Sequence, residues 1–151
     1  PARERADAET ERSELATMVR FIADTAAAFK LQIGTFGHMG DGNLHPTFLT
    51  DERDADEIAR VHTALDAIVH RTLELGGTIT GEHGVGVEKL DSMCVQFKPA
   101  ELETFHRIKR AFDERGLLNP GKAVPTLTRC AEYGRMHVHR GQDKFPDLPR
   151  F

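Results

Sequence analysis

Residues 33 to 49 read IGTFGHMGDGNLHPTFL, and the architecture of the domain can be predicted outward from them. Apolar residues flank its Gly-rich centre on both sides, which predicts two strands joined by a tight turn. Asp41-Gly42 is typical of a two-residue type I′ hairpin turn, whose two central positions both need positive φ. Centred on that turn, the hairpin would place His38 directly opposite His45, with Cβ atoms about 5 Å apart on one face of the sheet.

Helical periodicity lies on both sides of the hairpin. Before it, apolar residues recur at helical spacing from about residue 6 to residue 29. After it, Asp54 begins a capping-box-like sequence, and the apolar stripe that follows ends at Gly76-Gly77. A third helix is predicted from Pro99, a favourable first helical position, to a stop at Gly116.

The remaining segments are short or extended. The β-branched run at residues 78–80 predicts a strand that leads into the loop at residues 81–86, which reads GEHGVG. Beyond Lys122, proline and glycine breakers predict an extended C-terminal tail. With the length of 151 residues, these patterns predict one α+β domain, an antiparallel sheet built on the hairpin with helices packed on one face.

Composition excludes several classes of protein. A net charge of -4 leaves no basic stripe for phosphates, so nucleic-acid binding has no electrostatic basis. No apolar run approaches the roughly 20 residues that a membrane span needs. The two cysteines, Cys94 and Cys130, have no CxxC or metal-finger spacing, which favours ordinary thiols and a cytoplasmic location.

The two histidines of the hairpin predict a metal site. A zinc ion binds His nitrogens at about 2.0 to 2.1 Å, so two imidazoles on one face need only one or two further ligands. Glu82 is the third candidate ligand. Because its neighbour His83 is not expected to share its direction, His83 is predicted to be free for proton chemistry beside the ion.

Other interpretations of the same residues stay open or are excluded. A histidine in a glycine-rich turn is more often a hydrogen-bonded structural residue than a ligand. Two His and one carboxylate also suit a flavin-free metalloenzyme, either a non-haem iron oxygenase or a zinc hydrolase. A phosphate-binding loop is excluded because neither Gly-rich segment opens a helix or ends in the P-loop Lys-Ser/Thr pair. A calcium loop is excluded because the bidentate Glu at its twelfth position has no counterpart.

Three motifs in this order carry a resemblance to a known family. They are GHMGDGNLH at residues 37–45, GEHGVG at residues 81–86 and LNPGK at residues 118–122. Together they resemble the carboxy-terminal signature of FAD-linked oxidases of the vanillyl-alcohol oxidase type. The ending, from residue 129 to residue 151, is similar to the tail of the FAD subunits of bacterial glycolate oxidases in particular.

The resemblance implies a chemistry for the site. A 2-hydroxy acid, glycolate or D-lactate, would give its α-hydrogen as hydride to FAD while a base takes the hydroxyl proton. The resemblance also implies that His38, His45 and Glu82 bind a divalent metal ion, which would be zinc, manganese or iron. His83 becomes the general base, which suits an imidazole titrating near neutrality. The motifs also place Asn43, Asn119 and Lys122 near the flavin or substrate, as cofactor contacts.

The resemblance also implies partners and a missing portion. The chain would be the C-terminal part of the substrate (cap) domain, and the N-terminal FAD-binding domain would lie outside it. The isolated chain would then be inactive. Iron-sulfur and second flavin-type subunits of a glycolate oxidase complex are the implied partners, with cytoplasmic location or peripheral attachment to the inner membrane through them. A non-enzymatic alternative is a docking module that contacts a partner subunit through its tail, residues 125–151.

Overall fold

The computed structural model describes residues 2–5, 8–10 and 12–125 of the chain. The chain divides into two compact units, residues 1–84 and residues 85–151, and each is described by itself. The tail predicted beyond Lys122 falls, except for its first three residues, outside the described residues.

A central strand organises the sheet of the first unit. The strands are β1 (Ala2–Arg5), β2 (Ala8–Glu9), β3 (Gln32–His38) and β4 (Asn43–Thr50). β3 pairs with one side of β4, and both β1 and β2 pair with the other side, all antiparallel. β1 and β2 keep one register along β4, from Ala2 opposite Thr50 to Ala8 opposite Leu44.

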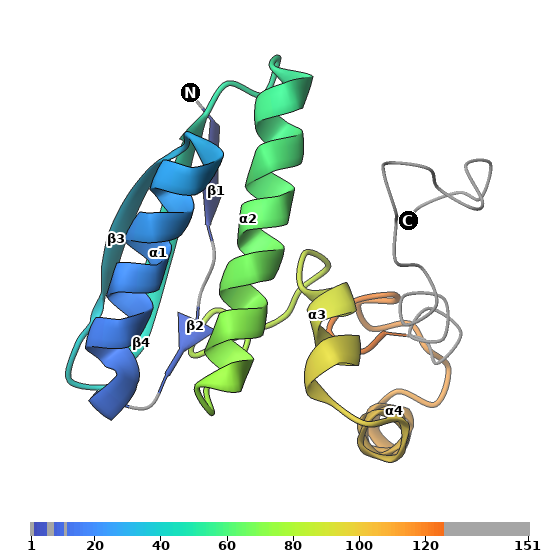
Figure 1. The fold of residues 1–151 in the computed structure, drawn as a ribbon. Helices are drawn as coiled ribbons and strands as arrows, with labels where there is room; N and C mark the ends of the chain where they lie inside the picture. Colours follow the sequence, from blue (N-terminus) through green and yellow to red (C-terminus); the bar gives the residue numbers. More distant parts are fainter. Residues whose placement is uncertain (1, 6–7, 11, 126–151) are drawn as a thin grey trace. The chain divides into compact units, whose positions relative to one another are not determined.

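Two helices cover one face of this sheet. Helices α1 (Leu15–Phe29) and α2 (Ala55–Glu74) lie side by side against it (Figure 1). Their apolar faces enclose a core with residues of β4 that point to the same side, because side chains in a strand alternate between its two faces. The buried residues of this core are Met18, Ile22, Leu31, Leu44, Phe48, Val61, Ala64 and Ile68. The α+β class, with an antiparallel sheet and helices on one face, is confirmed.

The beginning of the chain differs from the prediction. The helix predicted from residue 6 begins at Leu15, after the short 3₁₀ helix η1 (Arg12–Glu14), and residues 2–5 and 8–9 form β1 and β2. The free side of β4 supplies backbone partners for these residues. Pairing with an existing strand is a tertiary effect, and such an effect overrides a helical pattern in a short charged segment.

The second helix agrees with its predicted start and end. The Asp54 side chain accepts a hydrogen bond from the Glu57 backbone N–H at 3.0 Å, which caps α2, and α2 ends just before Gly76. The prediction of a strand at residues 78–80 is wrong. Of these three residues, Thr78 alone takes part in β pairing, as an isolated β-bridge to Glu9. β2 is two residues long, so it offers the following segment too little edge for a regular strand.

The second unit contains α3 (Leu90–Gln96) and α4 (Pro99–Phe112). α4 begins at Pro99 as predicted but ends four residues before Gly116. α3 was not predicted, because a helix of seven residues is too short to give a clear periodic pattern. Cys94 lies within α3, whereas Cys130 lies outside the described residues.

Asp113 fixes the chain that follows α4. Its carboxylate accepts hydrogen bonds from the backbone N–H groups of Leu117 at 2.8 Å and Leu118 at 2.9 Å, and from Lys109 Nζ at 3.0 Å. Burial raises the pKa of Asp113, but the hydrogen bonds from Leu118, Lys109 and Leu117 outweigh burial, so its pKa lies below the ordinary value. This carboxylate therefore orders the approach to residues 119–122.

Candidate metal centre

The hairpin has a wider turn than the sequence predicts. Residues 39–42 form a four-residue loop between β3 and β4, with His38 directly opposite Asn43. A backbone hydrogen bond from Asp41 N–H to His38 O at 2.9 Å closes the first part of this loop, and Gly42 has φ +78 while Asp41 has negative φ. The prediction of a two-residue type I′ turn is therefore wrong. Hairpin loops of four residues are most often built around a type I turn, not a type I′ turn.

The register changes as a consequence, but the shared face of the histidines does not. The residue directly opposite His45 is Phe36, and His38 lies diagonally across from His45, two positions away. A shift of two residues preserves the side of the sheet, because side chains alternate with a period of two. The two rings still meet, with centroids 5.7 Å apart and planes at 87°. They lie on the face of the sheet opposite to the core.

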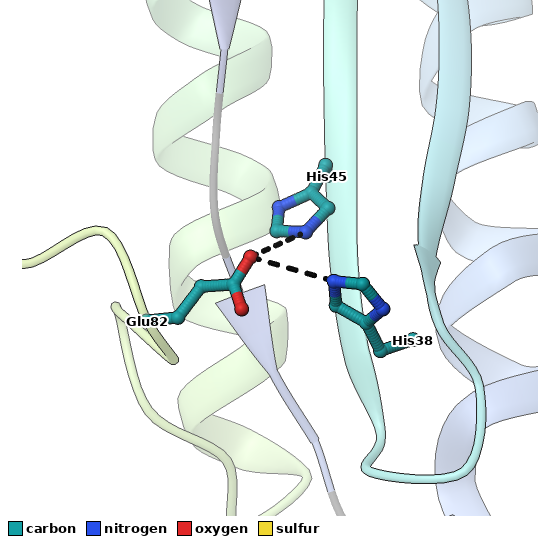
Figure 2. A group of neighbouring side chains, drawn as sticks. All are labelled: His38, His45 and Glu82. Carbon is teal, nitrogen blue, oxygen red and sulfur yellow. Dashed lines mark ion pairs between the residues drawn. The ribbon is translucent and has the colours of Figure 1, made fainter.

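Glu82 reaches both rings from the loop after α2. Its Oε1 lies 3.2 Å from His45 Nε2 and 3.5 Å from His38 Nε2. Figure 2 shows the three side chains pointing toward one another from the two strands and the loop. The pairing of Glu9 with Thr78, through backbone hydrogen bonds of 2.8 and 3.1 Å, ties the start of this loop to the sheet. Four residues beyond that bridge, the Glu82 carboxylate meets the two rings.

His83 also turns toward this cluster, which differs from the prediction. Its Nε2 lies 3.4 Å from Glu82 Oε1, and its ring stacks on that of His45 with centroids 4.8 Å apart and planes at 12°. The expected divergence of Glu82 and His83 assumes extended backbone, where neighbouring side chains point to opposite faces. Residues 81–83 form a bend instead. Three imidazole nitrogens therefore surround one carboxylate oxygen.

Exposure divides the cluster into a fixed part and an accessible part. The side chain of His45 is 14% exposed, whereas those of Glu82 and His83 are each 48% exposed and that of His38 is 59% exposed. His45 is therefore the anchored member. The other three present their nitrogen or oxygen atoms to a ligand that approaches from outside.

The donor set fits a divalent metal ion. The candidate ligand atoms of His38, His45 and Glu82 all lie within 4.8 Å of one another. Two atoms bound to a tetrahedral ion at about 2.0 to 2.1 Å lie roughly 3.4 Å apart. The separations of 3.2 and 3.5 Å between the carboxylate oxygen and the two nitrogens agree with that spacing. Three protein ligands leave a position for a further ligand, as catalytic sites require.

The three residues predicted to contact a cofactor lie in different surroundings. Asn43 is only 5% exposed and stands at the start of β4, beside the metal cluster. Asn119 and Lys122 are exposed in the second unit, where Asn119 has φ +44 and its carbonyl accepts a hydrogen bond from Lys122 N–H at 3.2 Å. All three remain predictions as cofactor contacts.

Sequence reasoning missed residues that hold the cluster in place. The backbone N–H of Thr10 donates to Gly42 O at 3.0 Å and so attaches the hairpin loop to the end of β2. Gly81 lies so close to Asn43 that a Cβ at position 81 would stand 2.9 Å from Asn43 Nδ2. No motif marks Thr10. Gly81 is the first glycine of GEHGVG, and the sequence pattern indicates only that the glycines of this motif make turns.

Known proteins resemble this chain over most of its length. The family described as FAD linked oxidases, C-terminal domain, matches residues 1–123. Glycolate oxidase subunit GlcD of Escherichia coli strain K12 is 46% identical over 145 residues, which are 96% of this chain and 29% of that protein. The GlcD subunit of Bacillus subtilis is 51% identical over 77% of the chain and 25% of its own length. A D-2-hydroxyglutarate dehydrogenase of Stutzerimonas stutzeri is 41% identical over 60% of the chain and 20% of that protein. The chain thus spans less than a third of the length of these relatives.

Proposed function

Because the chain belongs to the family of FAD-linked oxidase C-terminal domains, we propose that it forms the metal- and substrate-binding part of a flavin-dependent 2-hydroxy acid dehydrogenase. The observation that carries the proposal is the convergence of His38, His45 and His83 on one oxygen of Glu82. Two nitrogens and a carboxylate for an ion, with a further imidazole beside them, suit the oxidation of an alcohol next to a carboxylate.

Each residue of the cluster has a proposed task. His38, His45 and Glu82 hold the divalent ion, which is zinc, manganese or iron. The ion supplies Lewis acidity, which lowers the pKa of the substrate hydroxyl and attracts the substrate carboxylate. His83 Nε2 accepts the hydroxyl proton. Glu82 Oε1, 3.4 Å away, then stabilises the positive charge on that imidazole.

Geometry supports His83 as the base rather than as a fourth ligand. The candidate ligand atoms that lie within 4.8 Å of one another come from His38, His45 and Glu82, and the His83 ring stacks beside them on that of His45. A base must stand within hydrogen-bond reach of the proton that it removes, and this reach often tightens only when substrate binds. The side chain of His83 is half exposed, so a substrate can reach it from outside.

FAD is the proposed acceptor of the hydride, and its binding domain lies in the portion of the relatives that this chain does not match. Asn43, Asn119 and Lys122 are the proposed contacts of this chain with flavin or substrate. The exposed Lys122 ammonium can donate to an anionic or carbonyl oxygen.

Glycolate or D-lactate is the proposed substrate, supported by relatives named as glycolate oxidase subunits and as D-lactate dehydrogenases. The relatives named as GlcD are subunits, which supports partner subunits for this protein as well. We propose iron-sulfur and second flavin-type subunits. Within the described residues, no helix is long and apolar enough to cross a membrane. A cytoplasmic location, or attachment to the inner membrane through the partners, is proposed.

Metal analysis of variants tests the ion site. Elemental analysis of the purified protein should find about one equivalent of zinc, manganese or iron, and His38→Ala, His45→Ala and Glu82→Ala should each lose it. The matched control is His62→Ala, which removes an exposed imidazole on the outer side of α2 and should keep the metal. Retention of full metal by the cluster variants would show that these residues are structural.

Activity of the full-length protein tests the reaction. Glycolate or D-lactate should reduce an artificial dye only when FAD is bound, and His83→Ala should retain the metal while losing turnover. A flavin-free metalloenzyme makes the opposite prediction, namely metal-dependent hydrolysis or oxygen consumption without FAD. The docking-module alternative depends on the tail at residues 125–151, nearly all of which lies outside the described residues. Removing this tail should leave metal content unchanged under either function.

A further inference from the structure

Asn43 occupies the junction of the three segments that carry the candidate metal ligands. It is the first residue of β4, it lies directly opposite His38 in the β3–β4 pair, and it precedes His45 by two positions on the same face. Besides His38 and His45, it lies next to Gly81, the residue immediately before Glu82.

Contact between Asn43 and Gly81 involves the whole carboxamide. A Cβ built on Gly81 would lie 2.9 Å from Asn43 Nδ2, 3.0 Å from Cγ and 3.1 Å from Oδ1. These three similar distances place the Cβ position of residue 81 over the flat side of the amide, so the amide occupies the space that a side chain at this position would need. Gly81 does not have positive φ, so contact with Asn43, rather than backbone conformation, is what requires glycine there.

The Asn43 side chain is held firmly enough to serve as a support. The residue is 5% exposed, and its backbone is pressed against Gly37 of β3, where a Cβ would fall inside contact distance of Asn43 O. Its Oδ1 is buried without a hydrogen-bond partner among the described residues. An unpaired buried acceptor costs folding free energy. Hydrogen bonding within the described fold therefore does not explain the residue, whereas support of the neighbouring loop does.

We propose that Asn43 is a positioning residue whose buried carboxamide supports Gly81 and thereby sets the Glu82 carboxylate against both histidines. The proposal deepens the metal function proposed above and rests on it. Backbone hydrogen bonds between Glu9 and Thr78 tie the start of the Glu82 bend to the sheet. The Asn43 amide beside Gly81 adds a support next to the carboxylate, whose Oε1 lies 3.2 and 3.5 Å from the two nitrogens. Ligands fixed by their surroundings bind an ion more tightly than mobile ones.

A double-mutant cycle on zinc affinity tests this role. Gly81→Ala adds a methyl group that meets the amide, and Asn43→Ala removes the amide, so each should weaken Zn²⁺ binding at least tenfold in a competition titration. In the double variant the new methyl group enters the space left by the amide. Its affinity should therefore be no lower than that of Asn43→Ala alone. Gly40→Ala is the matched control, since a Cβ there meets nothing within 4 Å and φ is not positive.

Outcomes separate positioning from general stability. Thermal unfolding is measured on the same samples, and positioning predicts that zinc affinity falls in Gly81→Ala even at temperatures where the variant is fully folded. The proposal would be overturned if Gly81→Ala kept the wild-type affinity for zinc. It would also be overturned if Gly81→Ala lowered zinc affinity by the same factor in the wild-type protein and in the Asn43→Ala variant.

A separate readout applies if the wild-type protein binds none of Zn²⁺, Mn²⁺ and Fe²⁺, a result that would refute the metal function. The ¹⁵N chemical shifts of the imidazole nitrogens of His45 then report the position of Glu82 without any ion. They should change in both single variants and return toward the wild-type values in the double variant. Unchanged shifts in all variants would refute the positioning role itself.

Discussion

Replacing Gly37 with alanine should damage both the fold and the metal centre. Gly37 lies in β3 directly opposite Leu44, and a Cβ there would overlap Asn43 O and stand 3.1 Å from Leu44 Cα. Both neighbours are backbone atoms of the paired strand, so no side chain can move aside. Overpacking costs about 1–3 kcal/mol, and a weakened ladder hydrogen bond adds about 1 kcal/mol.

The expected loss in free energy of unfolding for Gly37→Ala is therefore roughly 2–4 kcal/mol. For a unit of this size, that loss lowers Tm by on the order of 10 °C or more. The strands must also separate next to His38, so zinc affinity should fall with stability. Urea unfolding followed by circular dichroism gives the first quantity, and a Zn²⁺ competition titration gives the second.

Gly34→Ala is the matched control in the same strand. A Cβ at Gly34 meets only the Phe36 ring, at 3.4 and 3.7 Å, which is ordinary van der Waals contact. Alanine is favoured over glycine in a strand by about 0.5–1 kcal/mol, so this variant should be as stable as the wild type or slightly more stable. If Gly37→Ala were as stable as Gly34→Ala and kept zinc, the close approach of the two strands would not be a constraint and the reasoning would be refuted.

Three further predictions concern single side chains. Phe48→Ala, at a site with no exposed surface, should lower the free energy of unfolding by about 3–5 kcal/mol in urea, and a loss below 1 kcal/mol would contradict the assigned core. Asp54→Ala removes the cap on Glu57 N–H and should cost about 1 kcal/mol by the same assay, whereas no loss would mean that the cap is not formed in solution. Asp113 has a lowered pKa in the folded protein, so its contribution to stability is complete above the ordinary Asp pKa of about 3.9 and is lost as pH falls through the lower folded value. Asp113→Asn should flatten the acid limb of a plot of unfolding free energy against pH, and an unchanged acid limb would contradict the assignment.

Local patterns in the sequence predicted the elements whose causes are local. The start of α2 was found because Asp54 and Glu57 make the cap within one turn of chain, and α4 began at Pro99 because proline suits the first helical position. The hairpin strands were found from apolar runs on either side of glycines. The motifs GHMGDGNLH and GEHGVG also identified the family, which the comparisons confirm.

Elements that depend on distant partners were predicted poorly. β1 and β2 exist because β4 has a free side, and no pattern within residues 2–9 indicates that side. The register of the hairpin depended on the length of its loop, which is the four residues 39–42 and not the two residues Asp41-Gly42. Both turns contain Asp41-Gly42, and the longer one is fixed in place by Thr10, which lies some thirty residues earlier.

The residue types available for the site, and the shared face of His38 and His45, follow from the sequence alone, because alternation along a strand survives a shift of two residues. The convergence of Glu82 and His83 on the two hairpin histidines depends instead on tertiary contacts. Their loop is bent, it is tied to the sheet through Thr78, and Gly81 rests against Asn43. Convergence of side chains from three segments is a property of packing, and packing is set by contacts between residues far apart in the chain.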